Sequence, residues 1–300
     1  MELLRLIEGI RTPFLDTLIG LVTRLGEETV GIVILCLIFW CISKRTAYII
    51  GVSFFLSSLT IQGMKICFRI ERPWVIDPTL EPVDGAKEYA TGYSFPSGHT
   101  QNATALYGSL STQVKSNLLM FILFLIPFMV AFSRMYLGVH TLLDVSVSLA
   151  ITFFLIWISV KLFSGKHDSL KRNLAISILI LVFAAAVIII AVMLYSNGMI
   201  EQMYMADCLK AAGAGIGFAI GMFIERTYIK FSVKSKSALR QVLKFIIGIA
   251  GVLALQEGLK PVIGTGLIVD MVRYFVVILW ITALYPLIIK RFFALKDAVA

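Results

Sequence analysis

Two histidines and one aspartate are placed where the sequence could carry out acid–base or nucleophilic chemistry. His140 and Asp144 are four residues apart at the head of an apolar segment, so one helical turn would bring their side chains together. The carboxylate could then fix the imidazole tautomer and stabilise its charged form. An ionisable pair inside a membrane helix favours a functional site over a purely structural pair. The chain has three histidines, and His167 in a basic loop is interpreted as solvated.

The second histidine follows a short polar stretch, Pro96-Ser97-Gly98-His99, at the start of another apolar segment. Gly98 lets the backbone approach a ligand closely, and the free N–H groups at a helix start attract anions. The alternative is an ordinary helix start with Ser97 as the N-cap. Both interpretations stay open at this stage, although His99 is harder to explain as a cap.

Positively charged residues accompany both histidines. Lys65, Arg69 and Arg72 are spaced to share one face of a helix that Pro73 helps to end, and Arg134 precedes His140 by six residues. Snorkelling of basic side chains to the membrane interface is the alternative for the first cluster. Cations that neutralise phosphoryl oxygens, one imidazole that attacks phosphorus and another that protonates the leaving oxygen are what phosphoryl transfer requires.

The composition places these residues in a membrane protein. Of 300 residues, 59% are hydrophobic and 15% are charged, against about 25% charged in soluble domains. The net charge of +9 is divided among short clusters between apolar runs, which argues against nucleic-acid binding. The four cysteines lie in or beside apolar segments and have no metal-ligand spacing, so neither a disulfide framework nor a zinc site is expected.

About nine membrane-spanning helices must position the site, because a bilayer needs about 20 mostly apolar residues per helix. The expected spans are residues 27–43, 46–66, 98–113, 117–134, 140–163, 173–195, 208–225, 242–258 and 267–289. The third is polar enough that it should face protein or water. Residues 1–24 are expected to form an amphipathic interfacial helix followed by a turn.

Basic clusters in alternate connections predict the orientation. They occur at 44–45, 115, 166–172, 226–240 and 290–291, which are therefore expected in the cytoplasm. The candidate site residues then face the extracytoplasmic side of an integral membrane protein, expected in the cell membrane. The long loop 74–95 lies on that side, and loops of such length are often functional.

Three motifs together resemble the signatures of the type-2 phosphatidic acid phosphatase superfamily: Lys65-x6-Arg72-Pro73, Pro96-Ser97-Gly98-His99 and Ser133-Arg134-x5-His140-x3-Asp144. The resemblance covers about residues 12–163. It implies an all-α integral membrane protein with a six-helix-type phosphatase core in residues 1–172, followed by a transmembrane extension of about four helices in residues 173–300. It also implies a metal-independent mechanism without a cofactor, in which His140 becomes a phosphohistidine, Asp144 orients it, and His99 is the general acid and then the base. The phosphate-binding residues implied in this way are Lys65, Arg72, Ser97, Gly98 and Arg134.

The leading hypothesis is therefore a phosphatase for a lipid phosphate or diphosphate, of the undecaprenyl diphosphate, phosphatidylglycerophosphate or phosphatidate class. The nine-span layout is similar to the glucose-6-phosphatase branch, so a soluble ester such as a sugar phosphate, or a phosphotransfer reaction, is the alternative. A non-catalytic phosphate or lipid transporter and a vanadium-dependent halide oxidase are further alternatives, and neither accounts for all of the features. In the extension, the stripe Gly213, Gly217 and Gly221 predicts close helix packing. Glu257 with Lys260, and Asp270 with Arg273, are interpreted as structural ion pairs rather than as the lining of a substrate route.

Overall fold

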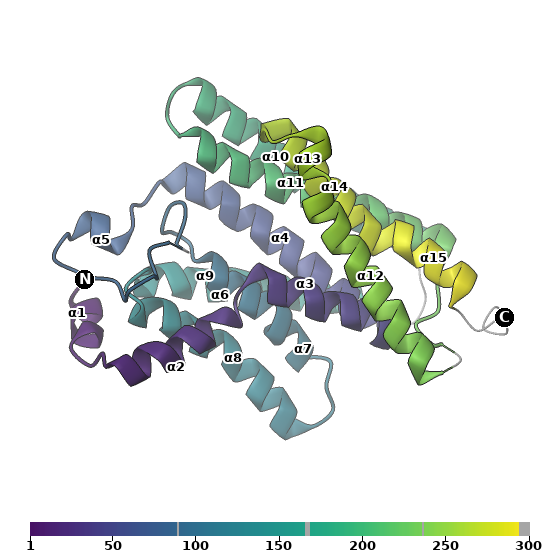
Figure 1. Ribbon diagram of the computed structural model, residues 1–300, viewed down its shortest axis with the longest axis horizontal. Coiled ribbons are helices and arrows are strands. Elements are labelled where there is room, and N and C mark those ends of the chain that lie inside the picture. The colour runs from purple at the N-terminus through teal and green to yellow at the C-terminus, as the bar shows by residue number, and fades with distance from the viewer. Residues whose placement is uncertain (89, 166–168, 236, 294–300) are drawn as a thin grey trace.

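The computed structural model describes residues 1–88, 90–165, 169–235 and 237–293 and is built from helices (Figure 1). The prediction for His167 lies outside the described residues. Four π-helical segments, η1 to η4, continue α-helices without a break. The elements are α1 (Glu2–Glu8), α2 (Pro13–Arg24), α3 (Glu28–Leu37), η1 (Ile38–Ile42), α4 (Lys44–Phe68), α5 (Pro73–Ile76), α6 (Gly98–Ala103), η2 (Thr104–Gly108), α7 (Ser109–Ser111), α8 (Asn117–Tyr136), α9 (Leu142–Leu162), α10 (Leu170–Ser196), α11 (Gln202–Ile224), η3 (Glu225–Ile229), α12 (Ala238–Gly258), α13 (Lys260–Ile263), α14 (Leu267–Leu279), η4 (Trp280–Leu284) and α15 (Tyr285–Phe292).

Within the described part of the chain, seven helices are long and apolar enough to cross a membrane, and an eighth results if α2 and α3 form one span bent by 46°. The expected count of nine is therefore reduced. The predicted span at 98–113 is lost in either count, because the helix formed by α6, η2 and α7 ends at Ser111 and is short and polar. The predicted span at 27–43 counts only together with α2, as the second part of the bent pair. Its residues Thr100, Gln101 and Thr104 are buried in protein, which is how such side chains avoid lipid.

The N-terminal segment forms two helices where one was expected. Thr12 caps α2 by accepting a hydrogen bond from the backbone N–H of Leu15, and Pro13 occupies the first turn. Proline suits a first helical turn but cannot continue a helix through its interior, so α1 and α2 are separate. Leu4 and Ile7 of α1 are buried in a small apolar cluster beside the end of α8.

The central element is α4, which packs against α9 on one side and against α10 and α11 on the other (Figure 1). Its buried face runs from Ala47 to Ile66. At its start, Lys44 forms a 2.8 Å ion pair with Glu225, and the Tyr48 hydroxyl donates to the same carboxylate. These contacts join α4 to the segment that follows α11.

The C-terminal helices pack closely on one another. A Cβ at Gly213 or Gly217 would clash with a backbone carbonyl oxygen of α14, and one at Gly221 would clash with Thr282 of η4. The small-residue stripe therefore makes the close helix contact that its spacing predicted. The two predicted ion pairs also form, with 2.8 Å between Lys260 and Glu257 and 2.8 Å between Arg273 and Asp270.

Candidate active site

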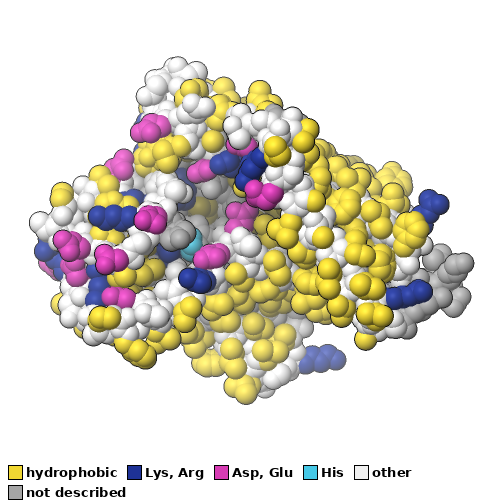
Figure 2. All heavy atoms as spheres, in the orientation of Figure 1, with side chains coloured by type: hydrophobic (Ala, Val, Ile, Leu, Met, Phe, Trp, Pro, Cys, Tyr) yellow, Lys and Arg dark blue, Asp and Glu magenta, His cyan; other side chains and the backbone are white. Residues whose placement is uncertain are grey.

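A cavity of about 550 Å³ lies between the N-terminal helices and the C-terminal helices. It opens on the face drawn in Figure 2, where acidic and basic side chains and a histidine surround a hollow. The hollow lies where the charged end of the molecule meets a broad hydrophobic surface (Figure 2). Six of the eight predicted site residues line the cavity: Lys65, Arg72, Gly98, His99, Arg134 and His140.

Asp144 lies behind His140, and its carboxylate has two hydrogen bonds and one ion-pair contact. Its Oδ2 accepts hydrogen bonds from the Ser94 hydroxyl at 2.6 Å and from the Thr141 backbone N–H at 2.7 Å, and it lies 3.4 Å from His140 Nδ1. Thr141 and Asp144 also form a capping box at the start of α9. His140 itself precedes this helix, so the cap, rather than the expected helical turn, brings the two side chains together.

The remaining ring nitrogen of His140 faces Arg72. Arg72 Nη1 donates to His140 Nε2 at 2.9 Å. Because a guanidinium has no acceptor, Nε2 must carry the lone pair, and the network assigns the ring proton to Nδ1, on the Asp144 side. His140 and Asp144 are 2% and 1% exposed, so this arrangement is shielded from competing water. Nε2 is therefore the nitrogen that can act as a nucleophile toward the cavity.

Arg72 lies outside the helix that was predicted to carry it. Helix α4 ends at Phe68, and Arg69 adopts a left-handed conformation with φ 52°. Arg72 is then the residue before the short helix α5, so Lys65, Arg69 and Arg72 do not share one helical face as expected. Lys65 and Arg72 still line the cavity, whereas Arg69 does not.

Arg134 completes the positively charged wall of the cavity, which His99 also lines. Arg134 is 3% exposed, and its Nη1 donates to the Thr23 hydroxyl at 2.8 Å. Its buried Nε–H has no hydrogen-bond partner among the described residues. A buried arginine N–H normally finds a partner, so this donor is available to an anion in the cavity.

The two interpretations of the Pro96–His99 stretch, a helix N-cap and a ligand-binding backbone, apply to different residues. The Ser97 hydroxyl accepts from the backbone N–H and the hydroxyl of Thr100, as an N-cap does, and Ser97 does not line the cavity. Gly98 lines the cavity, and a Cβ there would meet no atom within 4 Å. The open space beside Gly98 agrees with a backbone that a ligand can approach.

The segment Thr91–Ser94, at the end of the loop 74–95, contacts four of the predicted site residues: Lys65, Arg72, His140 and Asp144. The carbonyl oxygens of Thr91 and Gly92 accept from Arg72 at 2.6 and 2.9 Å, and the Tyr93 carbonyl accepts from Lys65 at 2.6 Å. Every residue type supplies a carbonyl, so no side-chain signal could have identified these contacts. Ser94 was detectable only as a serine close to the Pro96–His99 motif.

The long loop before this segment is held by α1. Arg5 contacts Asp77 at 2.6 Å and the Thr79 hydroxyl at 2.7 Å, and Glu8 accepts from the backbone N–H of Glu81. The hydrogen bond from Thr79 and the contact with Arg5 hold the pKa of Asp77 below its usual range. The loop 74–95 is thus fixed at both ends, by α1 and by the charged site residues.

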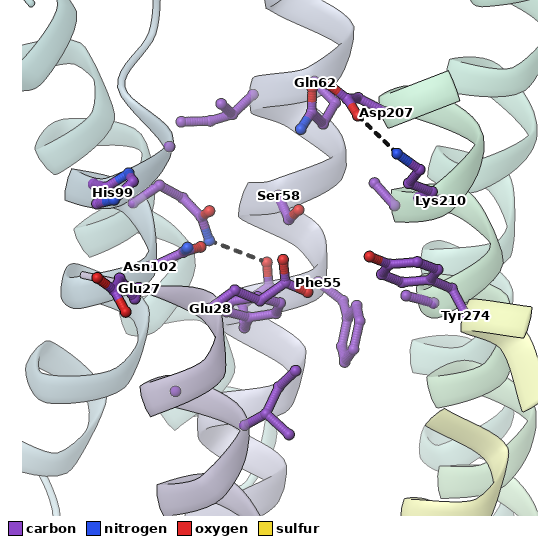
Figure 3. Close-up of a pocket in the computed structure, with 18 of the residues that line it drawn as sticks. Glu27, Glu28, Phe55, Ser58, Gln62, His99, Asn102, Asp207, Lys210 and Tyr274 are labelled. Carbon is purple, nitrogen blue, oxygen red and sulfur yellow. Dashed lines mark hydrogen bonds and ion pairs between the residues drawn. The ribbon is translucent and has the colours of Figure 1, made fainter. Parts of the chain in front are cut away.

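Side chains outside the three motifs also face the cavity (Figure 3). Glu28 of α3, Ser58 and Gln62 of α4, and Asp207 of α11 lie around the same space as His99. Among the described residues, no group of three or more His, Cys, Asp or Glu side chains is arranged to hold a metal ion. Metal independence itself stays a prediction.

Two solved structures are similar to this chain. One is described as the crystal structure of Aquifex aeolicus LpxE, with 29% identity, a TM-score of 0.49, and coverage of 53% of this chain and 93% of that chain. The other is described as the first transmembrane PAP2 type phosphatidylglycerolphosphate phosphatase from Bacillus subtilis, with 21% identity, a TM-score of 0.46, and coverage of 55% and 84%. No curated protein matches the chain.

Two family models match separate parts of the chain. Residues 46–168 match the PAP2 superfamily, and residues 209–297 match the transmembrane extension of PAP2 superfamily phosphatases. The first match includes all eight predicted site residues and so confirms the resemblance that the three motifs indicated. The chain therefore belongs to the PAP2 superfamily of membrane phosphatases and carries the superfamily's transmembrane extension.

Proposed function

We propose that this phosphatase hydrolyses the phosphate or diphosphate of a membrane lipid through a phosphohistidine on His140. The observation that carries the proposal is the hydrogen bond from Arg72 to His140 Nε2. Both residues line the cavity, and the lone pair of Nε2 points at the positively charged guanidinium. A phosphoryl oxygen that takes over the Arg72 N–H would place phosphorus beside that lone pair. When Arg72 donates to the phosphoryl oxygen instead of to Nε2, the substrate is bound and the lone pair of Nε2 becomes free to attack.

The proposed reaction has two steps. In the first, His140 Nε2 attacks phosphorus while the bond to the lipid oxygen breaks and His99 gives that oxygen a proton. Asp144 accepts the hydrogen bond of Nδ1–H and stabilises the positive charge on the ring. In the second, His99 takes a proton from water, whose oxygen attacks the phosphohistidine and releases inorganic phosphate.

The roles proposed for the binding residues follow from their charge and place. Lys65, Arg72 and Arg134 bring positive charges to the cavity, and Arg134 brings a donor that is otherwise unpaired. Gly98 contributes its backbone N–H group at the start of α6. The Ser97 N–H donates to the Asp144 carbonyl, so Ser97 supports the site as the N-cap of α6. These donors can stabilise the charge that accumulates on the phosphoryl oxygens in the transition state.

A lipid substrate is favoured by the position of the cavity mouth. The hollow in Figure 2 meets a hydrophobic surface, where a lipid could bring its head group to the cations without leaving the bilayer. We place the site on the extracytoplasmic face, because basic residues gather in the connections at the opposite end of the helices. Undecaprenyl diphosphate, phosphatidylglycerophosphate and phosphatidate are the substrates to test first.

The first experiment measures phosphate release by purified protein from these three lipids in the presence of EDTA. We expect turnover by the wild type and its loss in His140→Ala, with acid-labile radiolabel on the protein when His99→Ala slows the second step. Arg69→Ala is the matched control, because Arg69 does not line the cavity, and it should keep activity. Wild-type turnover in His140→Ala would refute the mechanism, and preference for glucose 6-phosphate over every lipid would refute the substrate class.

Orientation is tested separately by cysteine labelling in a variant whose native cysteines are replaced by serine. Asn197 follows α10 at the site end of the molecule, and Ser116 precedes α8 at the other end; both are exposed. In intact cells a membrane-impermeant maleimide should label Asn197→Cys and not Ser116→Cys. The reverse pattern would place the site in the cytoplasm.

A further inference from the structure

The cavity extends far beyond the proposed phosphate site. It follows α4 from Lys65 down to Ile50, a separation of roughly 22 Å at the helical rise of about 1.5 Å per residue. Its opposite wall comes from the transmembrane extension, through α11, α14 and η4. The phosphate site is therefore one end of a chamber shared by the core and the extension.

The half of this chamber next to the site is polar. Figure 3 shows Glu28, Asn102, Asp207, Lys210 and Tyr274 around one space. Lys210 contacts Asp207 at 3.3 Å, so its charge is partly balanced within the extension. Both signs of charge and several uncharged donors and acceptors line this half, which suits a hydrated head group.

The deep half is apolar. Its lining includes Phe55 on α4, Ala214 and Phe218 on α11, and Ile278 and Ile281 from α14 and η4. Phe55 and Phe218 are stacked, with ring centroids 4.6 Å apart. A space of this polarity, closed by aromatic and aliphatic side chains, favours a hydrocarbon group over water.

The extension also contacts the residues that hold the site. Tyr204 of α11 stacks on Tyr93 with ring centroids 4.2 Å apart, and Tyr93 supplies the carbonyl that accepts from Lys65. The extension thus contacts Lys65 through Tyr93. The apolar half of the chamber and the cations line one continuous cavity, so one ligand can contact both.

We infer that the transmembrane extension forms a binding site for the hydrocarbon tail of the substrate. The tail enters the deep apolar half of the chamber while the phosphate of the substrate lies at His140. The inference rests on the proposed function, and it adds the location of the hydrocarbon tail and the residues that bind it. The cavity volume of about 550 Å³ is in the range of sites that enclose one ligand of modest size, which favours a single chain. The competing location for the chain is the surrounding bilayer.

Chain-length dependence tests this inference. For the wild type, kcat/KM should rise from butyl to octyl to dodecyl phosphate, because each buried methylene contributes roughly fourfold. Ala214→Phe places a ring in the deep half of the chamber, and it should lower kcat/KM for dodecyl phosphate by at least about tenfold while butyl phosphate is unaffected. Ala185→Phe on the exposed face of α10 is the matched control and should keep the wild-type dependence.

The outcomes separate the two proposals. If Ala214→Phe keeps the full dependence on chain length, the chain lies outside the chamber and the inference is wrong. If the wild type hydrolyses none of the three esters but dodecyl phosphonate still binds more tightly than butyl phosphonate, and Ala214→Phe removes that difference, the proposed function fails and the chamber stands.

A crosslinking experiment on the wild-type protein guards against a variant that does not fold. Dodecyl phosphate with a diazirine at its terminal carbon should label peptides from α11 or η4. Labelling confined to the lipid-exposed residues of α8 would overturn the inference.

Discussion

Removing the Ser94 hydroxyl should lower turnover without weakening substrate binding. Ser94 is fully buried and donates to Asp144 Oδ2 at 2.6 Å, the shortest of the contacts to that carboxylate oxygen. A hydrogen bond to a charged group contributes about 1.5–3 kcal/mol, and about 1.4 kcal/mol is a factor of ten in rate. Because Thr141 still donates to Asp144, we expect the lower part of this range, a fall in kcat of about tenfold in Ser94→Ala.

The Michaelis constant separates positioning from binding. Ser94 does not line the cavity, so KM should stay near the wild-type value while kcat and kcat/KM fall together. The backbone contact from Ser94 N–H to the Ile70 carbonyl at 2.8 Å is retained in the variant and should keep the segment in place.

The assay is steady-state phosphate release from a lipid that the wild type hydrolyses, with the temperature of unfolding measured in parallel. Ser159→Ala is the matched control, because Ser159 is equally buried and its hydroxyl donates only to a helix carbonyl, that of Leu155. Wild-type kcat in a folded Ser94→Ala protein would refute the positioning role. A rise in KM with unchanged kcat would instead show that Ser94 contributes to binding.

Three further variants test the cations, the extension and its packing. Arg134→Gln removes a charged donor from the cavity, so KM should rise by about tenfold or more, and an unchanged KM would exclude Arg134 from phosphate binding. Tyr204→Ala removes a stacking contact with Tyr93 worth about 0.5–1.5 kcal/mol, so kcat should fall by roughly twofold to tenfold; undiminished activity would mean that the extension does not support the site. Gly213→Ala should lower the unfolding temperature through overpacking of about 1–3 kcal/mol, whereas Gly20→Ala, with no atom near its new Cβ, should not; equal unfolding temperatures would contradict the proposed contact with α14.

The membrane class and the main helices could be predicted because both depend on local sequence. An apolar run of the length of a bilayer must satisfy its backbone within one segment, so helices such as α8 and α10 are readable from hydrophobicity alone. The same reasoning overestimated residues 98–113, since a buried polar helix is stabilised by its neighbours and needs neither the length nor the surface of a lipid-facing span. Pro13 is a local signal for a helix start, and it divides the N-terminal segment into α1 and α2.

The candidate site was predictable in its members and not in its geometry. The residue types and their order within three motifs predicted Lys65, Arg72, His99, Arg134 and His140, and the structure brings these five residues to one cavity. Their roles in phosphoryl transfer stay predictions. The expected helical face from Lys65 to Arg72 was wrong, since a left-handed residue ends α4 before that face is complete.

By itself, the sequence determined that this chain is an all-helical membrane protein with the residues for phosphoryl transfer, because hydrophobic length and side-chain chemistry are properties of short segments. Only the tertiary structure decided that Arg72 donates to His140 Nε2, that Ser94 holds Asp144, and that the extension closes a chamber beside them. Those contacts join residues dozens of positions apart, and several use backbone carbonyls or small side chains. Such partners have no distinctive sequence signal, so only the packing of the helices selects them.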